Sequence, residues 1–226
     1  MPKLMRTLLP RPFRDRYRSK WLDANLEMKI CLAKITRLFF RPPFPILKNG
    51  TINLHLGCGS VVHAKFVNVD LVPAPHVHYV RSIDDLSPFK DNSVSLIHAS
   101  HCLEHFPHSI VSKVLSEWFR VLTKDGVLRL AVPNFDVLLD IYNENGKDIG
   151  LILSILMGGQ KYKYNFHKVV FTKSSLSSLL SNVGFRVIRE WQPGSCELTS
   201  FDDWSAHDVT ICGKDYPISL NIEAIK

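Results

Sequence analysis

The chain has 226 residues, of which 46% are hydrophobic and 22% charged, a composition typical of globular domains and unlike that of disordered segments. Its net charge of +7 is concentrated at one end. Residues 1–48 carry twelve Lys/Arg against three Asp/Glu, a net +9, and the remainder carries sixteen against eighteen, a net −2. Nucleic-acid-binding proteins usually spread basic residues over the binding surface, so this distribution argues against a nucleic-acid partner.

The cysteines indicate a reducing compartment. There are five of them, an odd number, and no pair has CxxC spacing, which argues against a disulfide framework and against a structural zinc site. No apolar run is long enough to span a bilayer, and no secretory signal is recognised at the N-terminus. We therefore expect a cytoplasmic protein.

The first predicted element is a helix over residues 21–40. Residues 1–20, rich in Arg and Pro, are expected to be irregular, and the run RPPFP at 41–45 is expected to end the helix. One face of the helix is apolar because four residues recur at helical spacing: Met28, Leu32, Ile35 and Phe39.

Two roles remain open for this basic extension, which comprises residues 1–48. Its apolar stripe could pack over the main domain, residues 49–226. Alternatively, the basic amphipathic helix could lie on an anionic membrane, at the inner face, or bind a partner.

Strands and helices then alternate along the main domain. Strands are expected at 51–56, 66–70, 77–80, 94–99, 127–132, 185–191 and 218–225. Helices are expected at 108–122, 135–143 and 173–182, with Asn134 and Thr172 as N-caps and Gly184 ending the last. Such alternation indicates an α/β fold, with a largely parallel sheet covered by helices on both faces.

A glycine turn, Gly57-Cys58-Gly59, follows the first strand and indicates a ligand site. Glycines let a ligand approach backbone N–H groups, and we expect that a side chain at Gly57 would enter the ligand space. Val62 stands where a dinucleotide-binding fingerprint needs its third glycine, and there is no phosphate-binding Gly-Lys-Ser/Thr. Asp70 ends the second strand, where a carboxylate can accept both ribose hydroxyls. A ribose site without a diphosphate cradle fits S-adenosylmethionine.

Five ordered blocks extend this interpretation: LHLGCGS…FVNVDL, DDLSPFKDNSVSLIHASHCLEHF, EWFRVLTKDGVLRLAVPNFD, LMGGQ…HKVVFTKSSLSSLLSNVGF and SLNIEAIK. Together they resemble class I S-adenosylmethionine-dependent methyltransferases, closest to the small type 11-like branch associated with polysaccharide biosynthesis. The resemblance covers about residues 50–226. It implies a Rossmann-like seven-stranded sheet of order 3-2-1-4-5-7-6 with the last strand antiparallel. Because only ten residues separate Gly59 from Asp70, the first helix must be very short.

The resemblance also implies further cofactor contacts. Asp84, Asp85 and Leu86 correspond to the loop near the adenine, where an Asp can accept from the exocyclic amine. Ser100 and His101, at the end of the fourth strand, are expected to complete the cofactor side of the site.

A cluster of histidines around Glu104 is the candidate catalytic group. His101, Glu104 and His105 share a face if their segment is helical, and the resemblance places His167 near the acceptor. A neutral histidine is suited to remove a proton from a hydroxyl near pH 7, so His105 and His167 are the candidate bases. Glu104 could orient a histidine or hold an acceptor hydroxyl. The cluster could instead bind a divalent metal, as in family members that methylate small RNAs. Our assignment includes no metal.

Residues 149–166 are expected to form the acceptor lid, in which Gln160, Tyr162 and Tyr164 offer polar groups and rings. The predicted function is methylation of a sugar hydroxyl on a glycan or nucleotide sugar, free or lipid-linked. Alternatives are a small phenolic or quinone-like acceptor, and an inactive cofactor-binding partner subunit.

Overall fold

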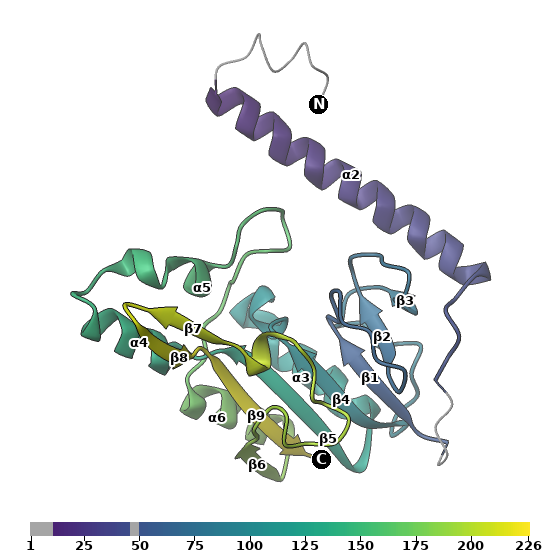
Figure 1. Ribbon diagram of the computed structural model, residues 1–226. Helices are drawn as coiled ribbons and strands as arrows, with labels where there is room; N and C mark the ends of the chain where they lie inside the picture. The colour runs from purple at the N-terminus through teal and green to yellow at the C-terminus, as the bar shows by residue number, and fades with distance from the viewer. Residues whose placement is uncertain (1–10, 46–49) are drawn as a thin grey trace.

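The computed structural model (Figure 1) describes residues 11–45 and 50–226, and for residues 11–19 it describes the backbone alone. The first ten residues of the predicted irregular segment and the predicted domain boundary at 48/49 lie outside the described residues.

A seven-stranded sheet forms the centre of the molecule, in the order β3-β2-β1-β4-β5-β9-β6. The first five of these strands pair in parallel, and β9 runs antiparallel to both β5 and β6. Because β9 is the last strand in the chain, this arrangement confirms the predicted order and the antiparallel final strand. The strands are β1 (Ile52–Leu56), β2 (Val67–Asp70), β3 (Tyr79–Val80), β4 (Val94–Ser100), β5 (Leu122–Pro133), β6 (Val187–Glu190) and β9 (Ser219–Ile225).

One face of the sheet is apolar and carries the main core. Alternate residues of each strand, such as Leu54, Ile97 and Leu130, pack against α3 (His108–Val121) and α6 (Lys173–Val183). Trp118 of α3 is fully buried there, and its indole N–H donates to the carbonyl oxygen of Ile83.

The helix ends follow local sequence rules. Asn134 caps α4 (Phe135–Glu144), and Thr172 and Ser175 form a capping box at the start of α6. Gly184 ends α6 with a φ of 119°, in the region that favours glycine. These three predicted caps are confirmed.

The opposite face of the sheet is more polar and is covered by the irregular segment 191–207. Phe201 of this segment stacks on His55 of β1 with ring centroids 4.9 Å apart, and its ring also contacts His98 of β4. The segment contains one 3-10 turn, η3 (Trp204–Ala206). Residues 57–66, between β1 and β2, form turns, so the very short helix expected there is replaced by loop structure.

Two small elements complete the body beside α4. A hairpin, β7 (Asp208–Ile211) and β8 (Lys214–Pro217), packs against α4 around Ile141 and Ile218. The lid begins with the turn η2 (Ile149–Leu151) and the short helix α5 (Leu153–Met157), and then continues as a loop. The sequence pattern did not predict the hairpin.

A long helix, α2 (Arg11–Phe39), lies outside the sheet, with its C-terminal end beside β3 (Figure 1). It begins ten residues earlier than predicted, because Pro12 is tolerated in a first helical turn, where its missing N–H is not needed. Its inward residues Leu26, Ile30 and Ala33 pack against the body around Cys58 and Val77. Within the described part of the chain, no helix is long and apolar enough to cross a membrane.

Candidate active site

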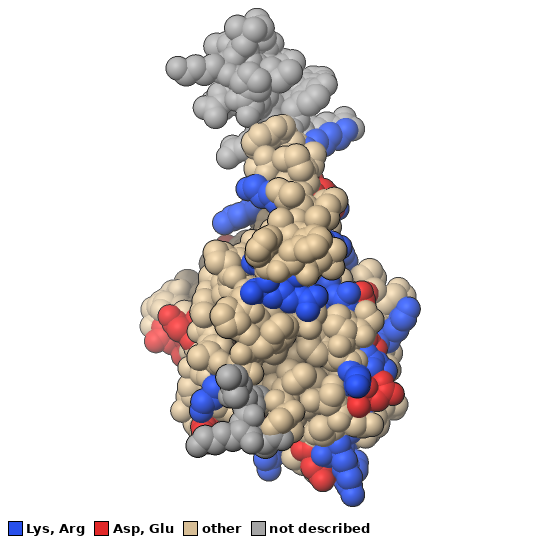
Figure 2. Space-filling model, turned by 90° about the vertical axis from the view of Figure 1, so that its right-hand side faces the viewer, with Lys and Arg blue, Asp and Glu red and all other residues tan. Residues whose placement is uncertain are grey.

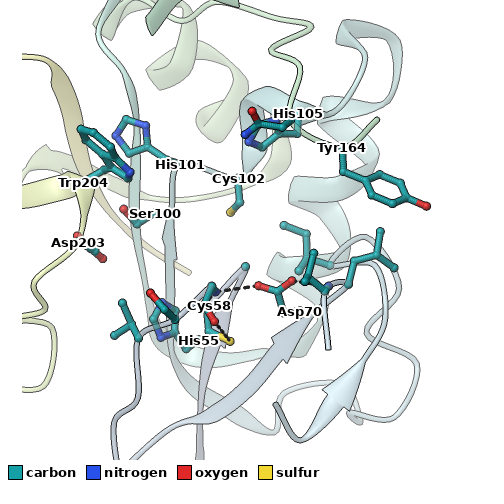
Figure 3. Close-up of a pocket in the computed structure, with 18 of the residues that line it drawn as sticks. His55, Cys58, Asp70, Ser100, His101, Cys102, His105, Tyr164, Asp203 and Trp204 are labelled. Carbon is teal, nitrogen blue, oxygen red and sulfur yellow. Dashed lines mark hydrogen bonds between the residues drawn. The ribbon is translucent and has the colours of Figure 1, made fainter. Parts of the chain in front are cut away.

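A cavity of about 880 Å³ opens at the carboxyl ends of the parallel strands. Asp70 and Tyr164 lie on one side of it, Asp203 and Trp204 lie on the opposite side, and His101 and His105 lie between (Figure 3). Ligand sites in open α/β sheets lie at this end of the strands, and this volume has room for two small molecules.

The glycine turn forms the floor of the cavity. Gly57 and Gly59 have φ values of 64° and 53°, in the left-handed region that glycine adopts without strain. A Cβ on Gly57 would lie 2.8 Å from Cβ of Cys102, whereas a Cβ on Gly59 would meet nothing within 4 Å. The expectation for Gly57 was therefore wrong: a side chain there would collide with Cys102, and the open space that suits a cofactor lies in front of Gly59.

Asp70 closes this side of the site. Its two carboxylate oxygens accept hydrogen bonds from the backbone N–H groups of Gly59, at 2.8 Å, and Val72, at 2.7 Å. Burial raises the pKa of Asp70 above its usual value, and these two hydrogen bonds lower it in part. Each oxygen keeps a second lone pair, so a ribose hydroxyl can still bind.

Most predicted cofactor residues line the cavity, but the predicted adenine loop does not. Gly57, Cys58, Gly59, Asp70, Ser100 and His101 all contribute to the wall. Leu86 is fully buried in the core, Asp85 pairs with Arg81 at 3.1 Å, and Asp84 is exposed. Ser82 and Ile83, just before this loop, contribute to the wall instead.

Glu104 is the buried centre of the histidine cluster. It lies in the 3-10 turn η1 (Leu103–His105), is 1% exposed, and neither of its carboxylate oxygens has a well-formed hydrogen bond. His101 Nδ1 lies 3.4 Å from Glu104 Oε1, and His167 Nε2 lies 3.8 Å from the same atom. Burial raises the pKa of Glu104, but the contact with His101 and the neighbouring His105 and His167 outweigh this effect and lower it below its usual value, so the carboxylate stays ionised.

The proton of His101 can be assigned from its partners. Ser219 Oγ donates to the carbonyl oxygen of Trp204 at 2.6 Å, so it accepts from His101 Nε2 at 2.7 Å. Nε2 therefore carries a proton, and Nδ1 faces the carboxylate of Glu104.

His105 offers a free ring nitrogen at the cavity wall. Its Nδ1 lies 3.0 Å from the carbonyl oxygen of Phe166, which can only accept, so Nδ1 carries the proton of the neutral ring. The Nε2 atom is then unprotonated. His167 lies behind it, with ring centroids 5.0 Å apart, and burial lowers the pKa of His167 and keeps it neutral at pH 7.

The sequence analysis missed one wall of the cavity, which the segment 191–207 supplies. Asp202, Asp203, Trp204 and His207 line it. Asp203 Oδ2 lies 2.8 Å from Nε2 of the buried His98. Burial raises the pKa of Asp203, but hydrogen bonds from His98 and Ser205 outweigh this effect and lower it to about 2. The run DDWSAHD, at 202–208, contains acids, a tryptophan and a histidine close together, and this could have marked the segment as part of a polar site.

Two groups of side chains in the described residues could hold a metal ion, each with its ligand atoms within 4.8 Å of one another. One is Glu104, His105 and His167. The other is His55, His98 and Asp203. Imidazole and carboxylate ligands of this kind suit borderline divalent cations such as Zn²⁺.

The lid contributes to the same cavity. Tyr162 and Tyr164 line the wall, whereas Gln160 is exposed outside it. The Tyr164 hydroxyl donates to Glu27 Oε1 of α2 at 2.6 Å, and the N–H of Lys163 donates to Asp23 Oδ1 at 3.1 Å. Helix α2 therefore holds the lid beside the cavity.

Comparisons with known proteins agree with this geometry. Residues 54–130, from β1 into β5, match the type 11 family described as a methyltransferase domain. No curated protein sequence matches the chain.

Solved structures share the fold. A S-adenosylmethionine-dependent methyltransferase from Thermotoga maritima superimposes with a TM-score of 0.51 at 16% identity, covering 95% of this chain and 97% of that one. Another from Archaeoglobus fulgidus gives a TM-score of 0.49 at 15% identity, covering 95% and 98%. Residues 54–130 thus match a methyltransferase domain, and the chain shares the fold of a solved S-adenosylmethionine-dependent methyltransferase. This match and this fold indicate S-adenosylmethionine as the cofactor.

Proposed function

We propose that the protein methylates a hydroxyl group of a sugar, on a glycan or a nucleotide sugar, with His105 as the general base. The observation that carries the proposal is the tautomer of His105. Because Nδ1 donates to Phe166, the neutral ring has a free lone pair on Nε2, and the ring lines the cavity.

The chemistry needs little more from the protein. When bound, S-adenosylmethionine supplies an activated methyl group and its leaving group. A sugar hydroxyl is a weak nucleophile until a base takes its proton, so His105 accepts that proton as the oxygen attacks. The buried carboxylate of Glu104 then lies close to the protonated His105 and stabilises its charge.

His167 packs against the ring of His105 and holds it in position. Its ring packs against that of His105 and is near Glu104, but it does not line the cavity. We therefore assign His105 to proton removal and His167 to positioning.

Polar side chains on both sides of the cavity support a sugar acceptor over a phenol. Asp202, His207 and Tyr162 offer donors and acceptors, and Trp204 offers a flat surface on which a sugar ring can stack. A phenol or quinone would be favoured by a closed apolar pocket. The grouping of Glu104, His105 and His167 also argues against an inactive subunit.

A turnover screen tests the proposal. Purified protein is incubated with methyl-labelled cofactor and a panel of sugars, nucleotide sugars, phenols and small RNAs, and methyl incorporation is measured. We expect incorporation into a sugar that falls at least about 100-fold in His105→Gln, the usual range for a general base. Incorporation into phenols or RNA alone would contradict the sugar assignment.

The proposed location is the cytoplasm. The odd number of cysteines and the lack of CxxC spacing support this location, because disulfides are rare in reducing compartments.

A further inference from the structure

Helix α2 has two apolar stripes on opposite faces, and the body covers only one. Leu26, Ile30 and Ala33 face the body and pack around Cys58. The opposite face, here called the outer stripe, consists of exposed apolar residues at helical spacing: Trp21, Met28, Leu32, Ile35 and Phe39.

The outer stripe includes the four residues that predicted the helix. They were expected to pack on the main domain or to contact a membrane, and in the structure they face away from the domain, with Leu32 62% exposed and Phe39 76% exposed. A row of large apolar side chains of this kind marks an interaction surface.

Basic side chains border the stripe. Lys29 lies on one side and Lys20 on the other, both exposed, since helical positions advance by 100° per residue. Figure 2 shows lysine and arginine side chains on both sides of the uncharged surface of the helix. Residues 1–48 together carry a net +9.

We propose that the outer stripe of α2 binds the surface of a bilayer that contains anionic lipids. An apolar stripe bordered by lysines matches such a surface, where apolar side chains enter the interface and cations meet lipid headgroups. The proposal goes beyond the reaction and holds whatever the acceptor is.

Charge favours a bilayer over a second copy of the chain. Two outer stripes packed face to face would bring two +9 extensions together, and like charges at an interface oppose association. An anionic lipid surface instead neutralises the same charge.

The contacts of α2 with the lid relate this surface to the cavity. Glu27 and Asp23 lie on the side of α2 that faces the lid, where they bind Tyr164 and Lys163. A bilayer on the outer stripe therefore leaves these contacts intact, and it places the cavity beside the membrane, within reach of an acceptor attached to a lipid.

Vesicle sedimentation with the full-length protein tests the proposal. The probes are phosphatidylcholine vesicles with and without phosphatidylserine. We expect binding only to the anionic vesicles, with a loss of at least tenfold when salt rises from about 0.1 M to about 1 M and the Debye length falls from about 10 Å to about 3 Å. Leu32→Glu with Ile35→Glu should abolish binding.

Leu139→Glu is the matched control, because Leu139 is an exposed leucine on α4, remote from the stripe. It should leave vesicle binding unchanged. Sedimentation velocity of the wild type and the double variant gives a second readout. The proposal is overturned if the wild type ignores anionic vesicles at low salt, if both variants bind equally, or if the double variant converts a dimer to a monomer.

Discussion

Positions 57 and 59 both favour glycine at the turn after β1, but for different reasons. A side chain on Gly57 would meet Cys102, and one on Gly59 would enter open space within the cavity. Gly59→Ala should therefore weaken S-adenosylmethionine binding by at least about tenfold, or about 1.4 kcal/mol, while the protein stays folded. Isothermal calorimetry measures the affinity, and thermal melting measures the fold.

A control separates backbone strain from loss of the ligand space. Gly213, in the β7–β8 turn, also has a positive φ of 81° and nothing near its Cβ position. Gly213→Ala should cost about 1–2 kcal/mol of stability, as the left-handed conformation does for other residues, and leave cofactor affinity unchanged. If Gly59→Ala and Gly213→Ala bind S-adenosylmethionine equally well, the cofactor does not occupy the space in front of Gly59.

The histidine cluster gives a second test at the level of single residues. Glu104→Gln removes the charge near His105 and His167 but leaves Gly59 and Asp70 untouched. We expect turnover to fall at least about tenfold with cofactor affinity retained, since general-base catalysis contributes 10²–10⁴-fold.

A chelator distinguishes the base from a metal ligand. If His105 acts as a base, the wild type keeps its activity after chelation, and metal analysis of the purified protein finds no stoichiometric ion. Loss of activity that a divalent cation restores would assign Glu104, His105 and His167 to a metal instead.

Sequence reasoning reached the residues whose roles follow from motif position. Asp70 ends β2, and Gly59 and His105 lie in the turns that follow β1 and β4, so all three reach the edge of the sheet where parallel strands end. Asp203 and Trp204 could not be placed this way. They reach the cavity because Phe201 anchors an irregular segment against His55 and His98, a tertiary contact with no sequence period.

At the scale of elements, the lid depends on α2. The Tyr164 hydroxyl donates to Glu27, and Lys163 forms an ion pair with the same carboxylate. Glu27→Gln should loosen the lid and raise the acceptor KM about threefold to tenfold, with little change in cofactor affinity, because the glycine turn is unaffected.

Two further measurements decide this prediction. Tyr164→Phe removes the hydroxyl and keeps the ring, so it should reproduce the effect of Glu27→Gln. Hydrogen exchange at the Lys163 amide, which donates to Asp23, should stay slow in Tyr164→Phe if Asp23 holds the lid independently. An unchanged acceptor KM in both variants would contradict the role of α2.

Elements with a strong hydrophobic period were predicted correctly, and elements with a weak period were missed. The parallel sheet and α3, α4 and α6 follow from strand-helix alternation and caps, whereas the order of the strands was implied by the resemblance to methyltransferases. The hairpin β7–β8 is short and half exposed, so it leaves little pattern to detect. On α2 the strongest apolar stripe marked an exposed face, because periodicity predicts a helix but not what covers it.

At the scale of the whole molecule, the buried His55 couples stability to pH. It is 1% exposed between the sheet and the segment 191–207, and burial lowers its pKa from 6.5 to about 3. Below pH 6.5 the unfolded chain takes up a proton on His55, whereas the folded chain does so only near pH 3. The unfolded state binds more protons in this window, so acidification favours unfolding.

The expected size follows from the same linkage. Between pH 7.5 and pH 5, His55 alone should reduce the free energy of unfolding by about 2 kcal/mol, since each pKa unit corresponds to about 1.4 kcal/mol. The pKa of His167 is lowered as well, and Asp203, with a pKa near 2, contributes stability that is lost only below this range.

Urea titrations of the cofactor-free protein at the two pH values measure the loss. His55→Asn, which cannot take up a proton in either state, should lose about 2 kcal/mol less than the wild type over the same interval. Equal losses in the two proteins would mean that His55 is not held neutral by the segment that covers it.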